Sequence, residues 1–151
     1  MSNIVFMGTP QFAVSILKKI TQKYKINCVF TQPPSKSNRG QKITKSPVHT
    51  CAEGLNLEIK TPKKIDEEFE YLKDLNLDLV IVVAYGQLIP KKILDLSKKG
   101  FLNIHASLLP KWRGAAPIQR SILNNEKTTG ISFMKINEKL DSGPVCNNYS
   151  I

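Results

Sequence analysis

Short apolar runs bounded by polar and turn-forming residues recur along the chain and predict buried β-strands. The clearest is Leu77–Ala84, whose continuous, β-branched sequence LDLVIVVA is typical of a central strand in a parallel sheet. The first run, Asn3–Met7, ends at Gly8. The same reasoning predicts strands over Ile26–Thr31, Leu57–Lys60, Phe101–His105, Ile131–Ile136 and Val145–Ile151.

Between these runs, apolar residues recur at helical spacing. The segment from Pro10 to Gln22 has a threonine before it as N-cap and a proline at its first position, so it is predicted to be a helix. Further helices are predicted over Pro47–Ala52, Ile65–Leu75, Ile89–Leu96 and Ala115–Leu123. The stretch Gln32–Lys45 is rich in turn residues and is predicted to be irregular.

The alternation of strands and helices predicts an α/β protein, with a Rossmann-like, open, mostly parallel sheet and helices on both faces. Ligands of such sheets bind beyond the carboxyl ends of the strands, so the loops after Gly8, Ala84 and His105 are where chemistry is expected. The first of these loops has Gly-Thr-Pro instead of G-x-G-x-x-G, and the chain has no P-loop. The usual dinucleotide site is therefore excluded.

Charge and cysteine content narrow the class of partner and the compartment. The net charge of +10 over 151 residues favours an anionic partner, which leaves nucleic acid, a phosphorylated metabolite or a membrane surface open. Three distant cysteines without C-x-x-C spacing argue against a disulfide framework or a zinc site. The amino terminus does not match a signal peptide, and no apolar run approaches the ~18 residues of a membrane span. A cytoplasmic location is expected.

The candidate chemistry centres on one of the two histidines. His105 ends a predicted buried strand, and Asn103, two residues earlier, projects from the same side of it. Without further context this pair could equally be the polar end of a strand. Asp141 lies in a turn between two predicted strands and could serve only to form that turn. His49, in a predicted short helix, is more typical of a solvated or packing histidine.

A longer pattern decides between these interpretations. The string NIHASLLP from Asn103 to Pro110, Arg113-Gly114 after it, and LDSG from Leu140 to Gly143 resemble the folate-dependent formyltransferases. Within that superfamily, SLLPKWRGAAPIQ from Ser107 to Gln119 is similar to the methionyl-tRNA formyltransferase branch. The opening FMGTPQF and the later FTQPP, which begins at Phe30, strengthen this similarity. It extends from Asn3 to about Val145.

The resemblance implies transfer of the formyl group of 10-formyltetrahydrofolate to the α-amino group of initiator methionyl-tRNA. Attack of an amine on a formyl carbon produces a tetrahedral oxyanion, which hydrogen-bond donors stabilise. Asn103 would donate through its amide and His105 through its protonated ring. Asp141 would hold the imidazolium and help to move the proton of the amine. Such chemistry requires no metal.

The resemblance also implies two binding regions. The folate site would be lined by Ser107, Leu108, Leu109 and Pro110, with Tyr85, Gly86, Gln87 and Leu88 completing the pterin pocket. The basic loop Ser35–Lys45, with Arg39 and Lys42, would bind the acceptor stem of tRNA. The alternative for that loop is a solvated run of charge. No stable protein partner is implied.

The chain departs from its family in two respects. Ala106 replaces the glycine that commonly separates the catalytic histidine from the serine. Family members are also about twice this length, so residues 1–151 are expected to be a formyltransferase catalytic domain that is incomplete at its carboxyl end, without the β-rich tRNA-binding domain. Two alternatives stay open: a related enzyme that formylates a nucleotide sugar or a purine-precursor amine, and a non-catalytic folate- or RNA-binding fragment.

Overall fold

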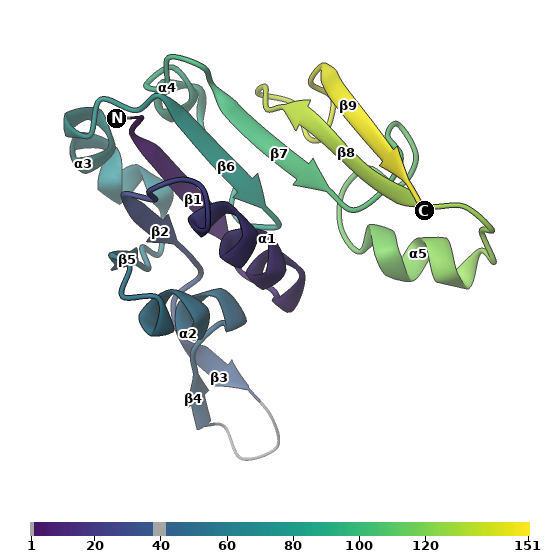
Figure 1. Ribbon diagram of the computed structural model, residues 1–151, viewed down its shortest axis with the longest axis horizontal. Helices are drawn as coiled ribbons and strands as arrows, with labels where there is room; N and C mark the ends of the chain where they lie inside the picture. The colour runs from purple at the N-terminus through teal and green to yellow at the C-terminus, as the bar shows by residue number, and fades with distance from the viewer. Residues whose placement is uncertain (1, 38–41) are drawn as a thin grey trace.

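The computed structural model describes residues 2–37 and 42–151. Within them, the main sheet has seven strands in the order β5-β2-β1-β6-β7-β8-β9 (Figure 1). Its strands are β1 (Ile4–Gly8), β2 (Cys28–Phe30), β5 (Ile59–Lys60), β6 (Leu79–Val83), β7 (Phe101–His105), β8 (Gly130–Lys135) and β9 (Val145–Ser150). Every pairing from β5 across to β7 is parallel, whereas β7–β8 and β8–β9 are antiparallel. The predicted open, mostly parallel sheet is confirmed.

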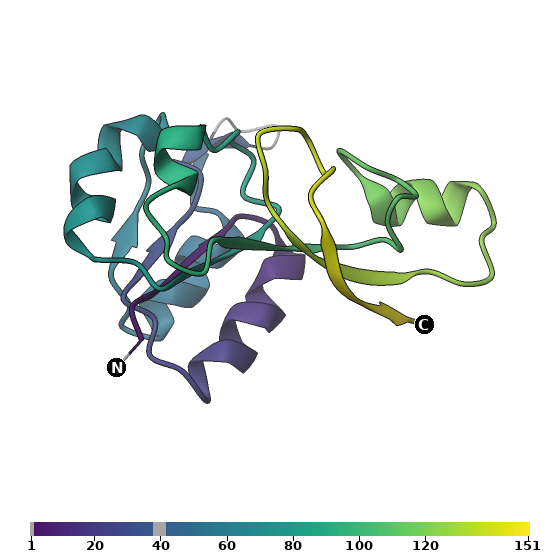
Figure 2. The ribbon, with the colours of Figure 1, turned by 90° about the horizontal axis from the view of Figure 1, so that it is seen from above.

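Helices cover both faces of the parallel part of the sheet (Figure 2). One face carries α1 (Gln11–Thr21) and α2 (Pro47–Gly54), and the other carries the 3₁₀ helix η1 (Ile65–Glu68), α3 (Phe69–Asp74) and α4 (Lys91–Leu94). The last helix, α5 (Pro117–Leu123), lies beside β8 and β9, away from the rest. No helix in these described ranges has the length and apolarity that crossing a bilayer requires.

The period of two along each strand divides the core into two buried clusters. Phe6 of β1 packs with Leu17 of α1 on one face, whereas Met7 faces the other cluster with Ile93 of α4. All four side chains are fully buried. Burial of a Leu, Ile, Phe or Met side chain stabilises a fold by about 1.5–3 kcal/mol. This two-sided burial explains why the predicted central strands are continuous apolar runs.

Two sequence predictions about local structure are corrected. The stretch Gln32–Lys45 is not wholly irregular, because β3 (Ser35–Ser37) and β4 (Lys42–Thr44) form a two-stranded antiparallel ribbon. These strands carry no core-facing apolar alternation, so the usual sequence signal of a strand is absent. The predicted helix Ile65–Leu75 begins with a 3₁₀ turn before α3. The ribbon follows β2, so it extends from the carboxyl-end edge of the sheet (Figure 1).

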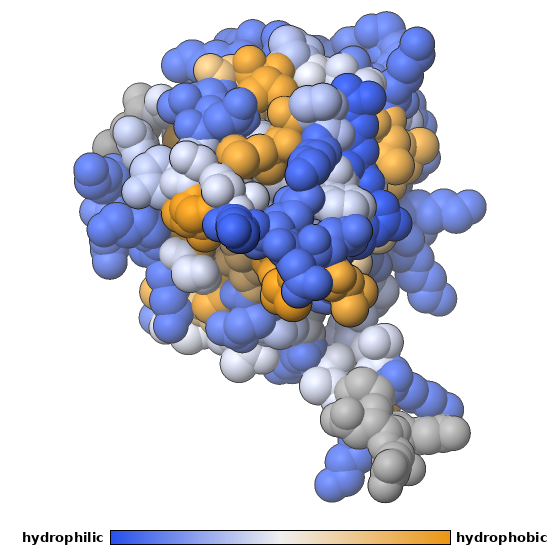
Figure 3. All heavy atoms as spheres, turned by 90° about the vertical axis from the view of Figure 1, so that its right-hand side faces the viewer, coloured by the Kyte–Doolittle hydropathy of each residue, from blue (hydrophilic) through white to orange (hydrophobic). Residues whose placement is uncertain are grey.

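The end of the molecule formed by α5 and β9 leaves apolar side chains uncovered. Ile122 and Leu123 on α5 are 69% and 80% exposed, and Tyr149 on β9 is 64% exposed. Figure 3 faces this end and shows hydrophobic residues scattered among hydrophilic ones. All six residues of β9 are exposed. The well-packed part of the molecule is therefore the parallel half, and the candidate site lies where that half meets β8.

Candidate active site

The structure brings Asn103, His105 and Asp141 together at one buried point. Asn103 and His105 lie on β7 and are 9% and 8% exposed. Asp141 follows β8, with its side chain 12% exposed. Its Oδ1 accepts a hydrogen bond from Asn103 Nδ2 at 3.3 Å, and its Oδ2 lies 3.9 Å from His105 Nδ1. The carboxylate thus faces both side chains that the strand period predicted to project together.

The second ring nitrogen of His105 is fixed by the main chain. His105 Nε2 donates to the carbonyl oxygen of Trp112, 2.9 Å away. Because a carbonyl oxygen can only accept, Nε2 carries a hydrogen, and Nδ1 is left facing the carboxylate. An imidazolium, with hydrogens on both nitrogens, suits both neighbours. This contact was not predictable from the sequence, because a main-chain carbonyl leaves no signature in residue type.

Asp141 is held by a main-chain donor as well. The N–H of Gly114 donates to Asp141 Oδ2 at 2.7 Å. Asp141 itself has a φ of 42°, in the left-handed region that Asp tolerates better than most residues. The carboxylate therefore receives hydrogen bonds from both Asn103 and Gly114, which fix its orientation.

A buried serine attaches the loop after β7 to β8. Ser132 is opposite His105 in the antiparallel register and is fully buried. Its hydroxyl donates to the carbonyl of Ser107 at 2.7 Å and accepts from the N–H of Leu109 at 2.9 Å. Ser107 Oγ in turn donates to the carbonyl of Lys111. Ser132 was not among the predicted site residues, although a serine inside a predicted strand is a usable signal.

An ion pair holds the same loop from outside. Lys111 Nζ pairs with a carboxylate oxygen of Glu126, whose side chain is only 12% exposed. Lys111, followed by the indole of Trp112, lowers the pKa of Glu126 below its ordinary value of 4.5. A carboxylate with a lowered folded-state pKa stabilises the fold fully above its unfolded pKa and loses this contribution as pH falls through the folded value.

Glu126→Gln is therefore expected to lower the free energy of unfolding at neutral pH. The difference from the wild type should shrink as the pH falls below about 4.5, because the wild-type carboxylate then becomes protonated. Urea denaturation of both proteins between pH 3 and 7 measures this. A difference that does not depend on pH would contradict an electrostatic role for Glu126.

Comparison with known proteins shows the family of the chain. Residues 2–151 match the family described as formyl transferase. The chain belongs to the formyl transferase family. It is 68% identical over 98% of its length to the methionyl-tRNA formyltransferase of Pelagibacter ubique and 48% identical over 94% to that of Caulobacter vibrioides. It spans about half the length of these curated relatives, 49% and 47% respectively.

Solved structures confirm the formyl transferase fold. Phosphoribosylglycinamide formyltransferase from Streptococcus pneumoniae, at 19% identity, superposes on all of this chain and 82% of its own with a TM-score of 0.78. A sugar 3N-formyl transferase solved in the presence of dTDP and 5-N-formyl-THF, at 25% identity, covers all of this chain and 52% of its own with a TM-score of 0.71.

The residues that the family resemblance predicts to bind folate differ in their exposure and in whether their main-chain groups are already hydrogen-bonded. In the loop after β7, the carbonyl of Ser107 and the N–H of Leu109 are already bonded to Ser132, whereas Leu108 is half-buried and Pro110 is exposed. Leu109 is buried, so of the apolar side chains in this loop only Leu108 and Pro110 are available to a ligand.

The loop after β6 shows the same division. Tyr85 is buried in the core, and Gln87 uses both ends of its amide to bind the N–H of Ile65 and the carbonyl of Pro62. Gly86 has a φ of 88° and is exposed, and Leu88 is 73% exposed. Only Gly86 and Leu88 of this segment thus present open surface.

The switch in strand order lies between β1 and β6, where a ligand crevice was expected. Here the carbonyl of Tyr85 accepts from Thr9 Oγ1 at 2.8 Å and from Gln32 Nε2 at 3.1 Å. These bonds join the loops after β1, β2 and β6. The candidate catalytic residues are displaced from the switch point to β7 and the turn after β8.

The remaining sequence candidates lie apart from the trio. Arg39 falls outside the described residues. Lys42 and Lys36 are exposed on the β3–β4 ribbon and form no ion pair within residues 2–37 and 42–151. His49 lies on α2 with Nε2 3.5 Å from Glu53, which fits the packing interpretation.

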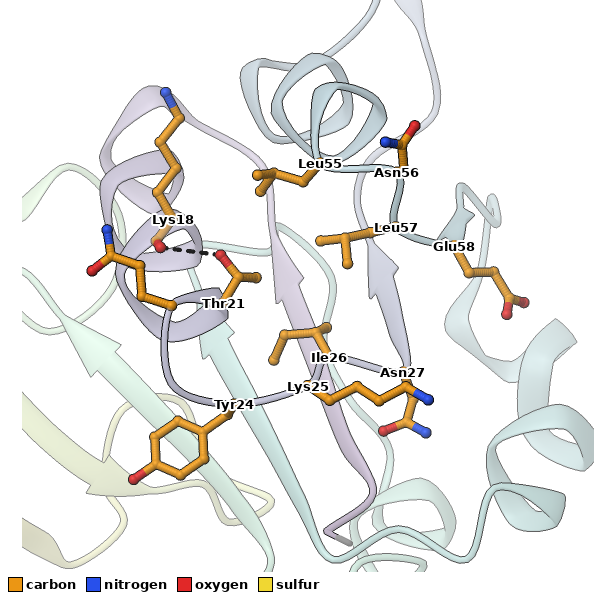
Figure 4. Close-up of a pocket in the computed structure, with 11 residues that line it drawn as sticks. Lys18, Thr21, Tyr24, Lys25, Ile26, Asn27, Leu55, Asn56, Leu57 and Glu58 are labelled. Atoms are coloured by element: carbon orange, nitrogen blue, oxygen red, sulfur yellow. Dashed lines mark hydrogen bonds between the residues drawn. The ribbon is translucent and has the colours of Figure 1, made fainter.

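A separate cavity of about 720 Å³ opens near the amino ends of the strands, opposite the candidate site (Figure 4). Its centre is apolar, with Ile26, Leu55 and Leu57 pointing inward from the segments after α1 and α2. Lys18 and Lys25 belong to its rim. It adjoins the amino end of β2, so it is not part of the site around His105.

Proposed function

We propose that this chain carries the formyl-transfer site of a methionyl-tRNA formyltransferase. The reaction would move a formyl group from 10-formyltetrahydrofolate to the amino group of initiator methionyl-tRNA, in the cytoplasm. The observation that carries the proposal is the buried grouping of Asn103, His105 and Asp141 in a chain 68% identical to a protein of that name.

The geometry suits a reaction through a tetrahedral intermediate. The amine nitrogen bonds to the formyl carbon, and the carbonyl oxygen becomes an oxyanion. Asn103 Nδ2 has two hydrogens and uses one on Asp141 over a long 3.3 Å contact, so it can donate the other to this oxyanion. The His105 imidazolium, whose two ring nitrogens face the Trp112 carbonyl and the Asp141 carboxylate, stabilises the oxyanion through its positive charge. A preorganised donor of this kind is worth about 3–4 kcal/mol in the transition state.

The intermediate collapses when the bond between the formyl carbon and the folate nitrogen breaks. The amine must lose one proton and the folate nitrogen must gain one. Asp141 is the nearest base, buried beside Nδ1 of His105, so it accepts the amine proton directly or through water and His105 assists its return to the leaving nitrogen. The protein forms no covalent bond to the formyl group in this scheme.

Two regions of the chain support the substrate assignment. Leu88, Leu108 and Pro110 offer apolar surface at the carboxyl edge of β6 and β7, and the sugar formyl transferase of similar fold was solved with a formylated folate. The β3–β4 ribbon carries Lys36 and Lys42 from the same edge of the sheet. A chain of net charge +10 also suits a polyanionic acceptor such as tRNA.

The test is competition between acceptors for one labelled formyl donor. The chain is incubated with 10-formyltetrahydrofolate labelled in the formyl group and with methionyl-tRNA, an amino-sugar nucleotide or a purine-precursor amine. Methionyl-tRNA should give the highest initial rate. Preference for the sugar nucleotide would replace the proposal with the related activity. Folate-analogue binding without transfer to any acceptor would indicate a binding module.

Lys42→Glu is expected to weaken tRNA binding without changing folate binding. A lost phosphate contact lowers the slope of log affinity against log salt by about 1. Binding titrations at several salt concentrations measure this. Lys23→Glu is the matched control, since Lys23 is exposed at the opposite edge of the sheet and the change in charge is the same. Equal effects from both variants would show that the ribbon makes no specific contact with tRNA and contributes only through the net charge of the chain.

A further inference from the structure

We propose that the turn Trp112–Gly114 positions the side chains of His105 and Asp141 for the reaction, and that Gly114 is the positioning residue of this turn. This inference rests on the proposed function. The turn offers one acceptor and one donor: the carbonyl of Trp112 receives the Nε2 hydrogen of His105, and the N–H of Gly114 reaches Asp141 Oδ2. The carbonyl, an acceptor, suits the positively charged imidazolium, and the N–H, a donor, suits the negatively charged carboxylate.

The two contacts set the roles of the side chains. With Nε2 anchored on Trp112, the imidazole ring cannot rotate, so Nδ1 stays on the side of the carboxylate. With Oδ2 anchored on Gly114, the carboxylate keeps Oδ1 toward Asn103. The turn therefore fixes both partners from outside, at 2.9 and 2.7 Å, whereas Asp141 and His105 themselves are 3.9 Å apart and hold each other only weakly.

The backbone of the turn depends on glycine. Gly114 has a φ of 81°, and Trp112 has a φ of 55°, so two residues of this short segment lie in the left-handed region. Non-glycine residues in this region persist where the surroundings determine them strongly, often at functional sites. The nearest atom to a Cβ on Gly114 is Leu140 Cδ2 at 3.8 Å, an ordinary contact. A Cβ there has room, so at that atom the conformation, and not a clash, restricts residue 114.

The loop is otherwise rigid enough for such a role. Ser132 fixes its beginning from β8, and Lys111 is tied to Glu126 immediately before the turn. Arg113, between the two contacting residues, is exposed. A change of φ at residue 114 would therefore move the two hydrogen-bonding groups while the rest of the loop stays attached.

The experiment compares Gly114→Val with Gly114→Asn. Both variants keep the main-chain N–H, and the two side chains are similar in size. Asparagine tolerates positive φ, whereas a β-branched residue strongly disfavours it. The first readout is the ring N–H of His105 in the chain labelled with ¹⁵N-histidine, which contains only two histidines. The second is the effect on kcat compared with that on KM for the folate donor.

We expect the valine variant to lose the exchange-protected Nε2–H signal and to lower kcat by about 10²-fold with KM little changed, since small misplacements cost this much. The asparagine variant should keep the signal and stay within about threefold of wild-type kcat, because its backbone geometry is retained. A valine variant with the wild-type signal, or an asparagine variant as impaired as valine, would overturn the inference. If the wild type transfers no formyl group, the proposed function fails, and the ring signal alone still decides whether Gly114 positions the pair.

Discussion

Asn103→Ala is expected to lower kcat for formyl transfer by about 10²–10³-fold, because it removes one preorganised donor to the oxyanion. The affinity for folate should stay near the wild-type value, since the amide acts on the transition state and not on the bound cofactor. His105→Ala should act in the same direction. Initial rates at saturating donor and acceptor measure the effect, and thermal denaturation checks that both variants fold.

The control is Asn148→Ala. Asn148 lies on β9, two strands away from Asn103, and its side chain is exposed. This variant should turn over like the wild type. If Asn103→Ala or His105→Ala also retained wild-type turnover, the proposed oxyanion site would be wrong.

Gly143→Ala is expected to damage both the fold and the site. A Cβ on Gly143 would overlap the main-chain carbonyl of Lys135 at the end of β8. Backbone cannot move aside as a flexible side chain can, so the turn that carries Asp141 must shift. Overpacking of this kind costs about 1–3 kcal/mol of stability. Since Asp141 is two residues away, kcat should fall by about 10²-fold or more.

Urea denaturation and initial rates measure these two effects. Gly54→Ala is the matched control, because a Cβ there meets nothing within 4 Å and Gly54 is the last residue of α2. It should leave turnover unchanged and raise stability by about 0.5–1 kcal/mol, since alanine favours helices more than glycine does. A Gly143→Ala protein as stable and active as the wild type would refute the tight turn against β8.

The parallel half of the fold was predictable because its strands are buried on both faces. The continuous, β-branched run Leu77–Ala84 is typical of a central strand, and β6 lies within it. The antiparallel β8 was predicted as a strand but not in its direction, which depends on pairing with β7 and not on local sequence. The β3–β4 ribbon was not predicted because its apolar residue, Ile43, is 74% exposed and gives no core-facing pattern.

In the candidate site, the side chains were predictable from the sequence and the main-chain contacts were not. Residue type and a period of two were enough to group Asn103 with His105. That Asp141 joins them depends on a contact 38 residues away in sequence, which the family pattern indicated and local reasoning did not. The carbonyl of Trp112 and the N–H of Gly114, which hold the trio in place, could not be predicted, because they are main-chain groups that every residue type has. Their positions follow from backbone torsions that no composition encodes.

Ser132 has a consequence for how the molecule responds to a ligand. It is the one side chain among the described residues that bonds both to Ser107 and to Leu109, and it belongs to β8. A ligand that rests on the 107–110 loop therefore also stabilises the ribbon formed by β8 and β9, and the two free energies are reciprocal. Occupancy of the 107–110 loop should therefore slow hydrogen exchange in β8, because ligand binding and the local unfolding of that strand are linked equilibria.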